Sequence, residues 1–214
     1  MESQHHTHST ATPSNAPLET NTTPPKKEEG FVTEIIRFSI IAFIIVLPIR
    51  MFIAQPFIVS GASMETTFSS GQYLIVDQVS YRFEEPKRGD VIIFRYPKDP
   101  SKFFIKRIIG IPGDTVTITG DTVQLDNKHF DAPTQLDEHY VLDMHINHDV
   151  EEVLGDGEYF VMGDNRNASS DSRMWGVLQR NHIIGKALIR LFPFTKLDVL
   201  PGAYDIDAEI MSSQ

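Results

Sequence analysis

The chain contains no cysteine. This absence excludes thiol catalysis, disulfide bonds and zinc–thiolate sites. Positive charge is also scarce, because 19 Lys and Arg residues stand against 29 Asp and Glu residues and the formal net charge is −10. Proteins that hold nucleic acid through its phosphates carry basic surfaces. The composition therefore argues against a nucleic-acid partner.

The first thirty residues have few apolar side chains and are rich in Ser, Thr, Pro, Asn and His. Such a segment cannot bury enough apolar surface to offset the entropy that it would lose on ordering. We therefore predict that residues 1–30 form a disordered tail. His5, His6 and His8 could bind a metal ion, but a solvated tail is the favoured interpretation.

A long hydrophobic run follows this tail. Its charge-free core, Phe38–Ile49, is shorter than the roughly 20 residues that cross a bilayer. Arg37 and Arg50 flank the core, and their side chains can extend to opposite interfaces, so that Ile35–Ile53 is long enough to span. We predict a transmembrane anchor over residues 31–55. A cleaved signal peptide and a buried core helix are the alternatives.

The basic residues around this segment predict its orientation. Lys26, Lys27 and Arg37 lie on the N-terminal side, whereas after Arg50 the next basic residue is Arg82. Loops rich in Lys and Arg stay on the cytoplasmic side of a membrane. We therefore expect a cytoplasmic N-terminus and an extracytoplasmic domain after the anchor.

The remainder of the chain favours β structure. Short segments rich in β-branched and aromatic residues are separated by turn signals such as Pro112-Gly113-Asp114, and no amphipathic helix of ordinary length competes. We predict a mostly β domain of coiled sheets over residues 56–203 and an acidic C-terminal tail over 204–214. The expected strands are 73–79, 90–96, 103–110, 114–119, 158–163 and 183–192.

Ser63, in FIVSGASMETTF, is a candidate nucleophile. A serine hydroxyl needs a base within hydrogen-bond reach. The pattern Ser-x-x-Lys is absent because Thr66 stands at the fourth position, and a Gly-x-Ser-x-Gly elbow is absent because Glu65 replaces its second glycine. Taken alone, Ser63 is better interpreted as an ordinary loop serine.

Lys106, in FFIKRIIGIPGD, is a candidate base. In a strand it shares one face with Phe104 and Ile108, and an ammonium group on an apolar face is costly to bury. Burial lowers the pKa of a lysine and yields a neutral amine that can accept a proton. A strand lysine whose ammonium group reaches solvent is the alternative.

A third block, GDNRNASSDSRMWG, covers residues 163–176 and crowds charged residues around three serines. Asp164, Arg166, Asp171 and Arg173 suggest a scaffold of ion pairs and turn hydrogen bonds. Such a loop can orient a neighbouring base. A solvated surface loop without a chemical role is an equal alternative.

Four blocks of this chain resemble those of the type I signal peptidases and stand in the same order. They are SGASMETTF, RGDVIIF, FIKRIIGIPGD and GDNRNASSDSRMWG, and they extend from about Val59 to Gly176. Four such blocks after one hydrophobic segment make the resemblance specific.

The resemblance implies a fold of coiled antiparallel sheets that form a pseudo-barrel behind one transmembrane helix. It also implies a membrane-bound endopeptidase that removes signal peptides from exported precursors through a Ser/Lys dyad and an acyl-enzyme. No cofactor or metal is expected. The implied partners are precursor proteins and the lipid bilayer, without an obligate protein partner.

The family's functional residues can be carried over to matching positions. Ser63 would be the nucleophile, Lys106 the general base, and Ser169 the serine that positions the lysine. Asp171 and Arg173 would support that region. The expected substrate-binding residues are Val59, Ser60, Gly61, Met64, Phe68, Phe104 and Ile105.

The oxyanion hole is only partly defined by the resemblance. The main-chain N–H of Ser63 would be one donor. Gly61 stands where some relatives carry a serine whose hydroxyl is a second donor, so the second donor stays open. Gly61→Ser is expected to keep activity, provided that this position does not need a positive φ.

Two other interpretations concern metal binding and function. The segment 136–152 contains His139, Asp143, His145 and His148, but their spacing fits no coordination motif, and an acidic insertion is favoured. A catalytically inactive membrane-tethered β domain and a self-cleaving repressor with a Ser/Lys dyad are the alternative functions. A repressor would carry a DNA-binding N-terminal domain in place of the hydrophobic segment.

Overall fold

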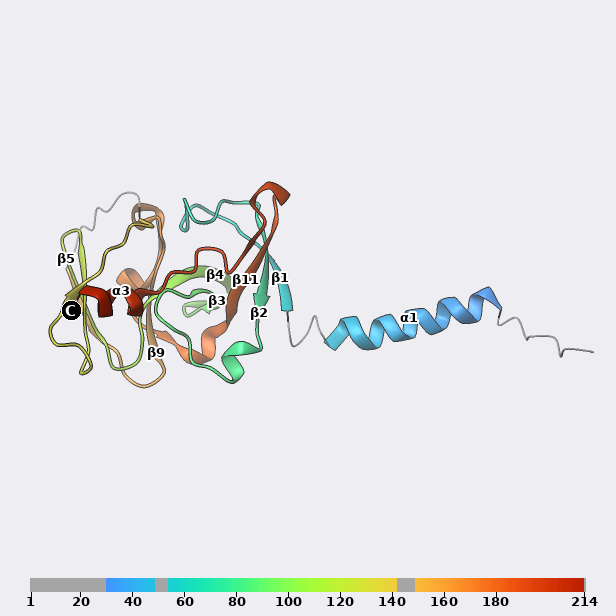
Figure 1. Ribbon diagram of the computed structural model, residues 1–214, viewed down its shortest axis with the longest axis horizontal. Helices are drawn as coiled ribbons and strands as arrows, with labels where there is room; N and C mark the ends of the chain where they lie inside the picture. The colour runs from blue at the N-terminus through green and yellow to red at the C-terminus, as the bar shows by residue number, and fades with distance from the viewer. Residues whose placement is uncertain (1–29, 49–53, 142–148, 214) are drawn as a thin grey trace, which may run out of the picture. The chain divides into compact units, whose positions relative to one another are not determined.

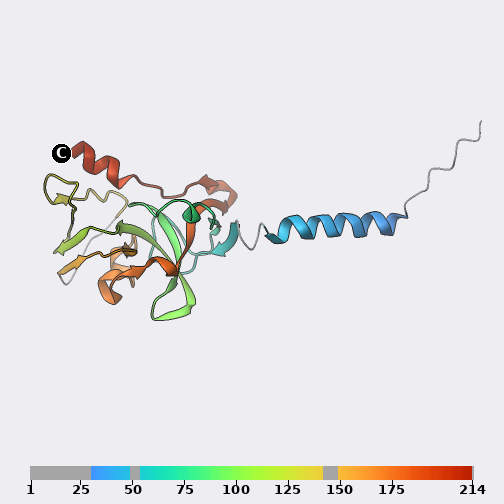
Figure 2. The same ribbon diagram turned by 90° about the horizontal axis from the view of Figure 1, so that it is seen from below.

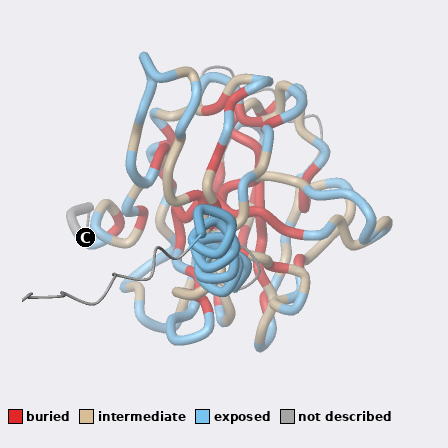
Figure 3. The backbone as a smooth tube through the Cα atoms, turned by 90° about the vertical axis from the view of Figure 1, so that its right-hand side faces the viewer, coloured by how far each residue is buried: buried red, intermediate tan, exposed pale blue. Residues whose placement is uncertain are grey.

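The computed structural model describes residues 30–48, 54–141 and 149–213. All of the predicted tail except Gly30 therefore lies outside the described residues. Helix α1 (Phe31–Pro48) has 18 residues, a mean hydropathy of 2.1 and no buried residue (Figure 3). At 1.5 Å per residue it is about 27 Å long, close to the hydrocarbon thickness of a bilayer. By length and composition α1 is a candidate membrane span.

The described helix extends to Pro48, and residues 49–53 of the expected anchor lie outside the described residues. Strand β1 (Ala54–Ile58) follows, so the last two residues of the expected anchor belong to the β domain. The expected limit of the anchor at residue 55 therefore falls inside β1, which contains Gln55 and Pro56 between apolar residues.

Most strands belong to one antiparallel sheet in the order β1-β2-β11-β3-β4-β9-β10, with β12 paired to β11 (Figure 1). β11 lies between β2 and β3, and β4 pairs with β9, so the sheet draws its central strands from both halves of the domain. Besides β1, its strands are β2 (Tyr73–Asp77), β3 (Val91–Tyr96), β4 (Asp99–Gly110), β9 (Glu158–Met162), β10 (Leu178–Gln179), β11 (Ile183–Phe192) and β12 (Asp198–Val199).

A smaller antiparallel sheet has the order β7-β6-β5-β8. Helix α3 (Ile206–Ser213) lies against it (Figures 1 and 2), and Ile206 and Ile210 are buried in the same apolar cluster as Val116 of β5. The strands are β5 (Thr115–Thr119), β6 (Thr122–Asp126), β7 (Thr134–Gln135) and β8 (Val150–Val153).

The packing of α3 differs from the acidic tail expected after residue 203. Ile206 and Ile210 are spaced four residues apart, so they share one face of a helix and can be buried together. The acidic residues between them contact the rest of the domain, because Asp207 pairs with Arg88 and Glu209 accepts a hydrogen bond from the Asp137 N–H. The remaining short helices are η2 (Ser80–Arg82), η3 (Arg166–Ala168), α2 (Ser172–Trp175), η4 (Arg180–His182) and η5 (Phe194–Lys196).

The prediction of a mostly β, antiparallel fold is confirmed, and each of the six expected strands coincides with an observed one. Two free strand edges matter for the site. Within the described residues β1 pairs only with β2, and β9 pairs with β4 only over residues 107–110. Before residue 107, the edge of β4 that faces away from β3 therefore has no strand partner among the described residues. The edge of β1 that faces away from β2 has none either.

Candidate active site

Ser63 lies in the turn that connects β1 to β2. The turn is anchored on both sides of the serine, because Val59, Met64 and Phe68 are at most 5% exposed and pack with Leu74. The Phe68 N–H donates to the Met64 carbonyl at 2.7 Å. Apolar burial thus fixes the serine backbone while its side chain stays accessible.

Lys106 lies on β4, opposite Ile92 of β3, and is only 3% exposed. Its Nζ is 2.8 Å from the Ser63 Oγ and 2.9 Å from the Ile105 carbonyl oxygen. The amine also lies 5.3 Å from the centre of the Phe104 ring. The structure therefore places the candidate base within hydrogen-bond distance of the candidate nucleophile.

Burial lowers the pKa of Lys106 from 10.5 to about 8. The carboxylates of Asp171 and Asp164 oppose this effect, and the guanidinium of Arg173 adds to it. With a pKa near 8, about one lysine in ten is neutral at pH 7, against about one in 3,000 for an unperturbed side chain. A proton acceptor is thus present at ordinary pH.

A cavity of about 420 Å³ opens beside these two residues. The predicted residues Val59, Ser60, Phe104 and Ile105 line it together with Ser63 and Lys106. Sequence reasoning missed several lining residues, which lie on strands β1 to β4 and, for Ser170, on the loop after β9. These are Phe57, Ile58, Leu74, Ile93, Lys102, Phe103 and Ser170.

Three predicted substrate-binding residues are absent from the cavity wall. Met64 and Phe68 are 1% and 0% exposed and belong to the apolar core beneath the turn. Gly61 has a φ of 95°, a conformation that side chains with a Cβ rarely adopt. The condition attached to the Gly61→Ser expectation is therefore not met.

The loop after β9 contacts the nucleophile through its backbone. The Asn165 N–H donates to the Ser63 carbonyl at 3.1 Å. A Cβ added at Gly163 would lie 2.3 Å from both the Ser63 carbonyl oxygen and the Ser169 Oγ, so only glycine fits there. The Ser169 hydroxyl is buried and has no hydrogen-bond partner among the described residues. Its positioning of Lys106 stays a prediction.

Asp171 and Arg173 hold this loop together. Asp171 is fully buried and accepts hydrogen bonds from Arg173 Nε at 2.7 Å and Arg173 Nη2 at 2.8 Å. Arg173 Nη2 also donates to the Arg166 carbonyl at 2.8 Å, and the Gly163 N–H donates to Asp171 at 3.1 Å. Each buried charge is therefore paired or hydrogen-bonded.

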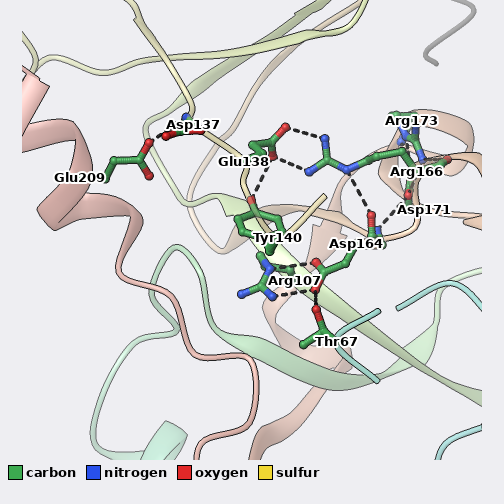
Figure 4. Close-up of polar contacts among 11 residues, drawn as sticks. Thr67, Arg107, Asp137, Glu138, Tyr140, Asp164, Arg166, Asp171, Arg173 and Glu209 are labelled. Carbon is green, nitrogen blue, oxygen red and sulfur yellow. Dashed lines mark hydrogen bonds and ion pairs between the residues drawn. The ribbon is translucent and has the colours of Figure 1, made fainter. Parts of the chain in front are cut away.

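A second buried ion pair lies behind Lys106. Arg107 is 1% exposed and donates to Asp164 from Nε at 2.9 Å and from Nη2 at 2.7 Å (Figure 4). The Thr67 hydroxyl donates to the same carboxylate at 2.6 Å. Sequence reasoning missed Arg107 and Thr67, although an arginine inside the apolar run of β4 was a usable signal. This pair links the strand of Lys106 to both site loops.

A third pair lies beside it. Arg166 donates to Glu138, which also accepts a hydrogen bond from the Tyr140 hydroxyl at 3.0 Å (Figure 4). The ring of Tyr140 lies 4.1 Å from the Arg107 guanidinium carbon. The segment predicted as an acidic insertion therefore supplies a buried carboxylate that neutralises the charge of Arg166 in the loop after β9.

Comparison with protein families matches residues 32–192 to the family described as "Signal peptidase, peptidase S26". The chain belongs to this family. It is therefore a peptidase, and the alternative of a self-cleaving repressor is not supported.

Curated relatives agree with this assignment. The chain is 38% identical over 173 residues to "Probable signal peptidase I-1" of Synechocystis sp., covering 78% of this chain and 85% of the relative. It is 34% identical to "Signal peptidase I" of Leptolyngbya laminosa, covering 90% and 96% of the two chains. A solved signal peptidase I from Enterococcus faecalis is 28% identical, with a TM-score of 0.40 and coverage of 48% of this chain and 97% of that one.

The histidines singled out in the sequence do not form a metal site in the part of the chain that the structure describes. There, no group of three His, Asp or Glu side chains is arranged to hold an ion. His139 instead packs edge-on against Tyr204 at 4.6 Å. Asp143, His145 and His148, like the histidines of the N-terminal tail, lie outside the described residues.

Proposed function

We propose that this protein is a membrane-anchored signal peptidase that cleaves signal peptides from precursors, with Ser63 as nucleophile and Lys106 as general base. The observation that carries the proposal is the 2.8 Å distance between the Ser63 Oγ and the amine of a lysine that is 3% exposed. A nucleophile and a base in hydrogen-bond contact are the minimum for acyl transfer. Family membership supplies the substrate class.

The reaction follows from this contact. The neutral Lys106 amine takes the Ser63 proton while the Oγ attacks the scissile carbonyl carbon. The resulting ammonium then protonates the departing nitrogen, so the mature protein leaves as a free amine and the signal peptide stays esterified to Ser63. Lys106 next takes a proton from water, which attacks the ester, and returns that proton to the Ser63 Oγ as the signal peptide leaves. The N–H of Ser63 is the proposed oxyanion donor.

Substrate binding uses the two unpaired strand edges. β1 and the first part of β4 both line the cavity and offer main-chain donors and acceptors. An extended peptide that enters between them can pair with these edges as an added strand. The apolar side chains of Val59, Phe104 and Ile105 then contact alternate residues of the substrate.

The supporting residues act through the lysine and the loop. Asp171 and Arg173 hold the loop that contacts the Ser63 carbonyl, and Ser169 lies on that loop beside the serine. We assign Ser169 a positioning role toward Lys106 during the reaction. Of the expected substrate-binding residues, Met64, Phe68 and Gly61 act by shaping the turn rather than by touching substrate.

The membrane arrangement is part of the same proposal. α1 anchors the enzyme, the N-terminal tail is cytoplasmic, and the domain from residue 54 works outside the cytoplasm near membrane-bound precursors. The asymmetry of Lys and Arg around α1 supports this orientation. Lipid and precursor are then the only partners that the reaction needs.

The test is cleavage of a model precursor by the full-length protein in detergent. Wild type should release the signal peptide, and Ser63→Ala should not. Ser101→Ala is the matched control, since Ser101 is an exposed serine on β4 itself. Equal cleavage by wild type and Ser63→Ala would refute the nucleophile, and no cleavage by wild type would favour the inactive tethered domain.

A further inference from the structure

The charged side chains that line the cavity are all of one sign. They are Lys102 and Lys106, and no carboxylate of the described residues lines it. This is unexpected in a chain with a formal net charge of −10. Lys106 is accounted for by the proposed chemistry, whereas Lys102 is not. Lys102 therefore needs a separate explanation.

Lys102 and Lys106 lie four residues apart on β4. β4 pairs regularly with β3 from Phe103 onward, and Lys102 is the residue just before this paired part, where the register shifts between Asp99 and Phe103. In an extended chain, residues i, i+2 and i+4 share one face, so Lys102, Phe104 and Lys106 form a row. At about 3.3 Å per residue, the two lysines are about 13 Å apart along the strand. One end of the row touches the nucleophile, and the other end lies at the far part of the same cavity.

The surroundings of Lys102 carry excess positive charge. Its amine is 3.0 Å from the Asp99 carboxylate, with both side chains largely or partly exposed at 64% and 38%. Arg95 and Lys98 belong to the same hairpin, and the Arg95 guanidinium stacks on the ring of Phe103 at 5.1 Å. Because an exposed ion pair is weak, Asp99 can share Lys102 with another anion.

We infer that Lys102 is a specificity-determining residue that favours an acidic side chain about four residues before the cleaved bond. The inference rests on the proposed function, in which the scissile carbonyl lies at Ser63 and the substrate runs along the edge of β4. In this proposal the substrate runs parallel to β4 and advances by the same rise per residue. Because Lys102 precedes Lys106 on β4, the substrate residue level with Lys102 is four positions before the one level with Lys106.

The expected effect is modest. Exposed ion pairs stabilise weakly, and the apolar walls of the cavity place this one toward the upper end of that range. An aspartate at the fourth upstream position should therefore raise kcat/KM about two- to fivefold over alanine, and a lysine there should lower it by a similar factor. High salt should reduce both effects.

The experiment compares three peptides that differ only at the fourth upstream residue, which is Asp, Ala or Lys. Full-length wild type, Lys102→Glu and Lys98→Glu are assayed on each. Lys98→Glu is the matched control, because it makes the same charge change on the same hairpin but residue 98 does not line the cavity. Wild type and Lys98→Glu should prefer Asp, and Lys102→Glu should prefer Lys.

Additional variants and peptides test whether the effect is specific to residue 102 and to the fourth substrate position. Lys102→Met, at a side chain that is 64% exposed, should abolish the preference without reversing it. Circular dichroism checks the fold of every variant. The same peptides with the charge at the second or sixth position should show no dependence on residue 102. An equal preference in wild type and Lys102→Glu, or an equal change in Lys98→Glu, would overturn the inference.

Failure of the inference can be told apart from failure of the proposed function. Cleavage of the alanine peptide by wild type tests the function and does not involve the charge. Binding of the three peptides to Ser63→Ala, followed by fluorescence anisotropy, reads the charge preference without any cleavage. Equal affinities there would refute the role of Lys102 even for an active enzyme.

Discussion

Replacing Lys106 by methionine should stabilise the folded protein near neutral pH while abolishing cleavage. Burial lowers the pKa of Lys106 from 10.5 to about 8. A lowered lysine pKa means that the folded state disfavours the charged form. Below pH 8 folding must either bury the ammonium group or release its proton, and above about pH 10.5 neither cost exists. This group therefore makes the protein more stable as pH rises between these values.

The size of this change in stability follows from the pKa shift of Lys106. A difference of about 2.5 pKa units corresponds to about 3 kcal/mol of unfolding free energy. Methionine fills similar volume without charge, but it loses the contacts of the amine with Ser63 and Ile105, each worth about 1 kcal/mol. At pH 7 we expect Lys106→Met to be about 1–3 kcal/mol more stable than wild type, and by pH 10.5 equal or less stable.

The assay is urea unfolding of the full-length proteins in detergent at pH 6 to 10.5. Trp175 is the single tryptophan and packs near Phe94, so its fluorescence reports the β domain. Lys102→Met is the control, because that side chain is exposed and should show no pH-dependent gain. A stability difference between wild type and Lys106→Met that stays constant with pH would refute the buried-amine argument.

Three further predictions follow from the same geometry. Single-turnover cleavage should rise with pH along a limb centred near the Lys106 pKa of about 8, and a rate that is flat from pH 6 to 9 would contradict a neutral-amine base. Deleting residues 1–48 should leave activity on a soluble peptide. Deleting residues 1–58 should abolish it, because β1 pairs with β2 and lines the cavity. Equal activity of the two truncated proteins would disprove this role of β1. Gly61→Ser and Gly61→Ala should both lose activity by a similar factor in a peptide assay, since the φ of 95° strains any Cβ; a gain with serine alone would show instead that a second oxyanion donor is missing.

Much of the fold could be predicted because its central strands are local patterns. Strands such as β3 and β5 are short runs of β-branched residues between turn signals, and each was expected within about two residues of its observed limits. β7, β10 and β12 have two residues each, and pairing with a neighbour rather than composition makes them strands. β8 contains two glutamates, whose charge concealed it in the sequence.

The candidate site was less accessible to the same reasoning. The apolar neighbours of Lys106 predicted its burial, but nothing local in the sequence brings it to Ser63, 43 residues away. That pairing came from the resemblance to a family. Met64 and Phe68 were assigned to the substrate pocket by the same resemblance, whereas the turn directs both into the core.

The buried ion pairs explain why the site needs more than its two reactive residues. Burial away from water favours the neutral form of Lys106. The next residue on β4, Arg107, is charged and is buried in the same interior. Asp164 pairs with Arg107 and comes from the loop whose Asn165 N–H binds the Ser63 carbonyl. The charge that would otherwise destabilise β4 therefore fixes the loop that holds the nucleophile. Removing Asp164 would leave Arg107 buried without its carboxylate, which is strongly destabilising, so the position of Ser63 and the folding of β4 depend on the same contact.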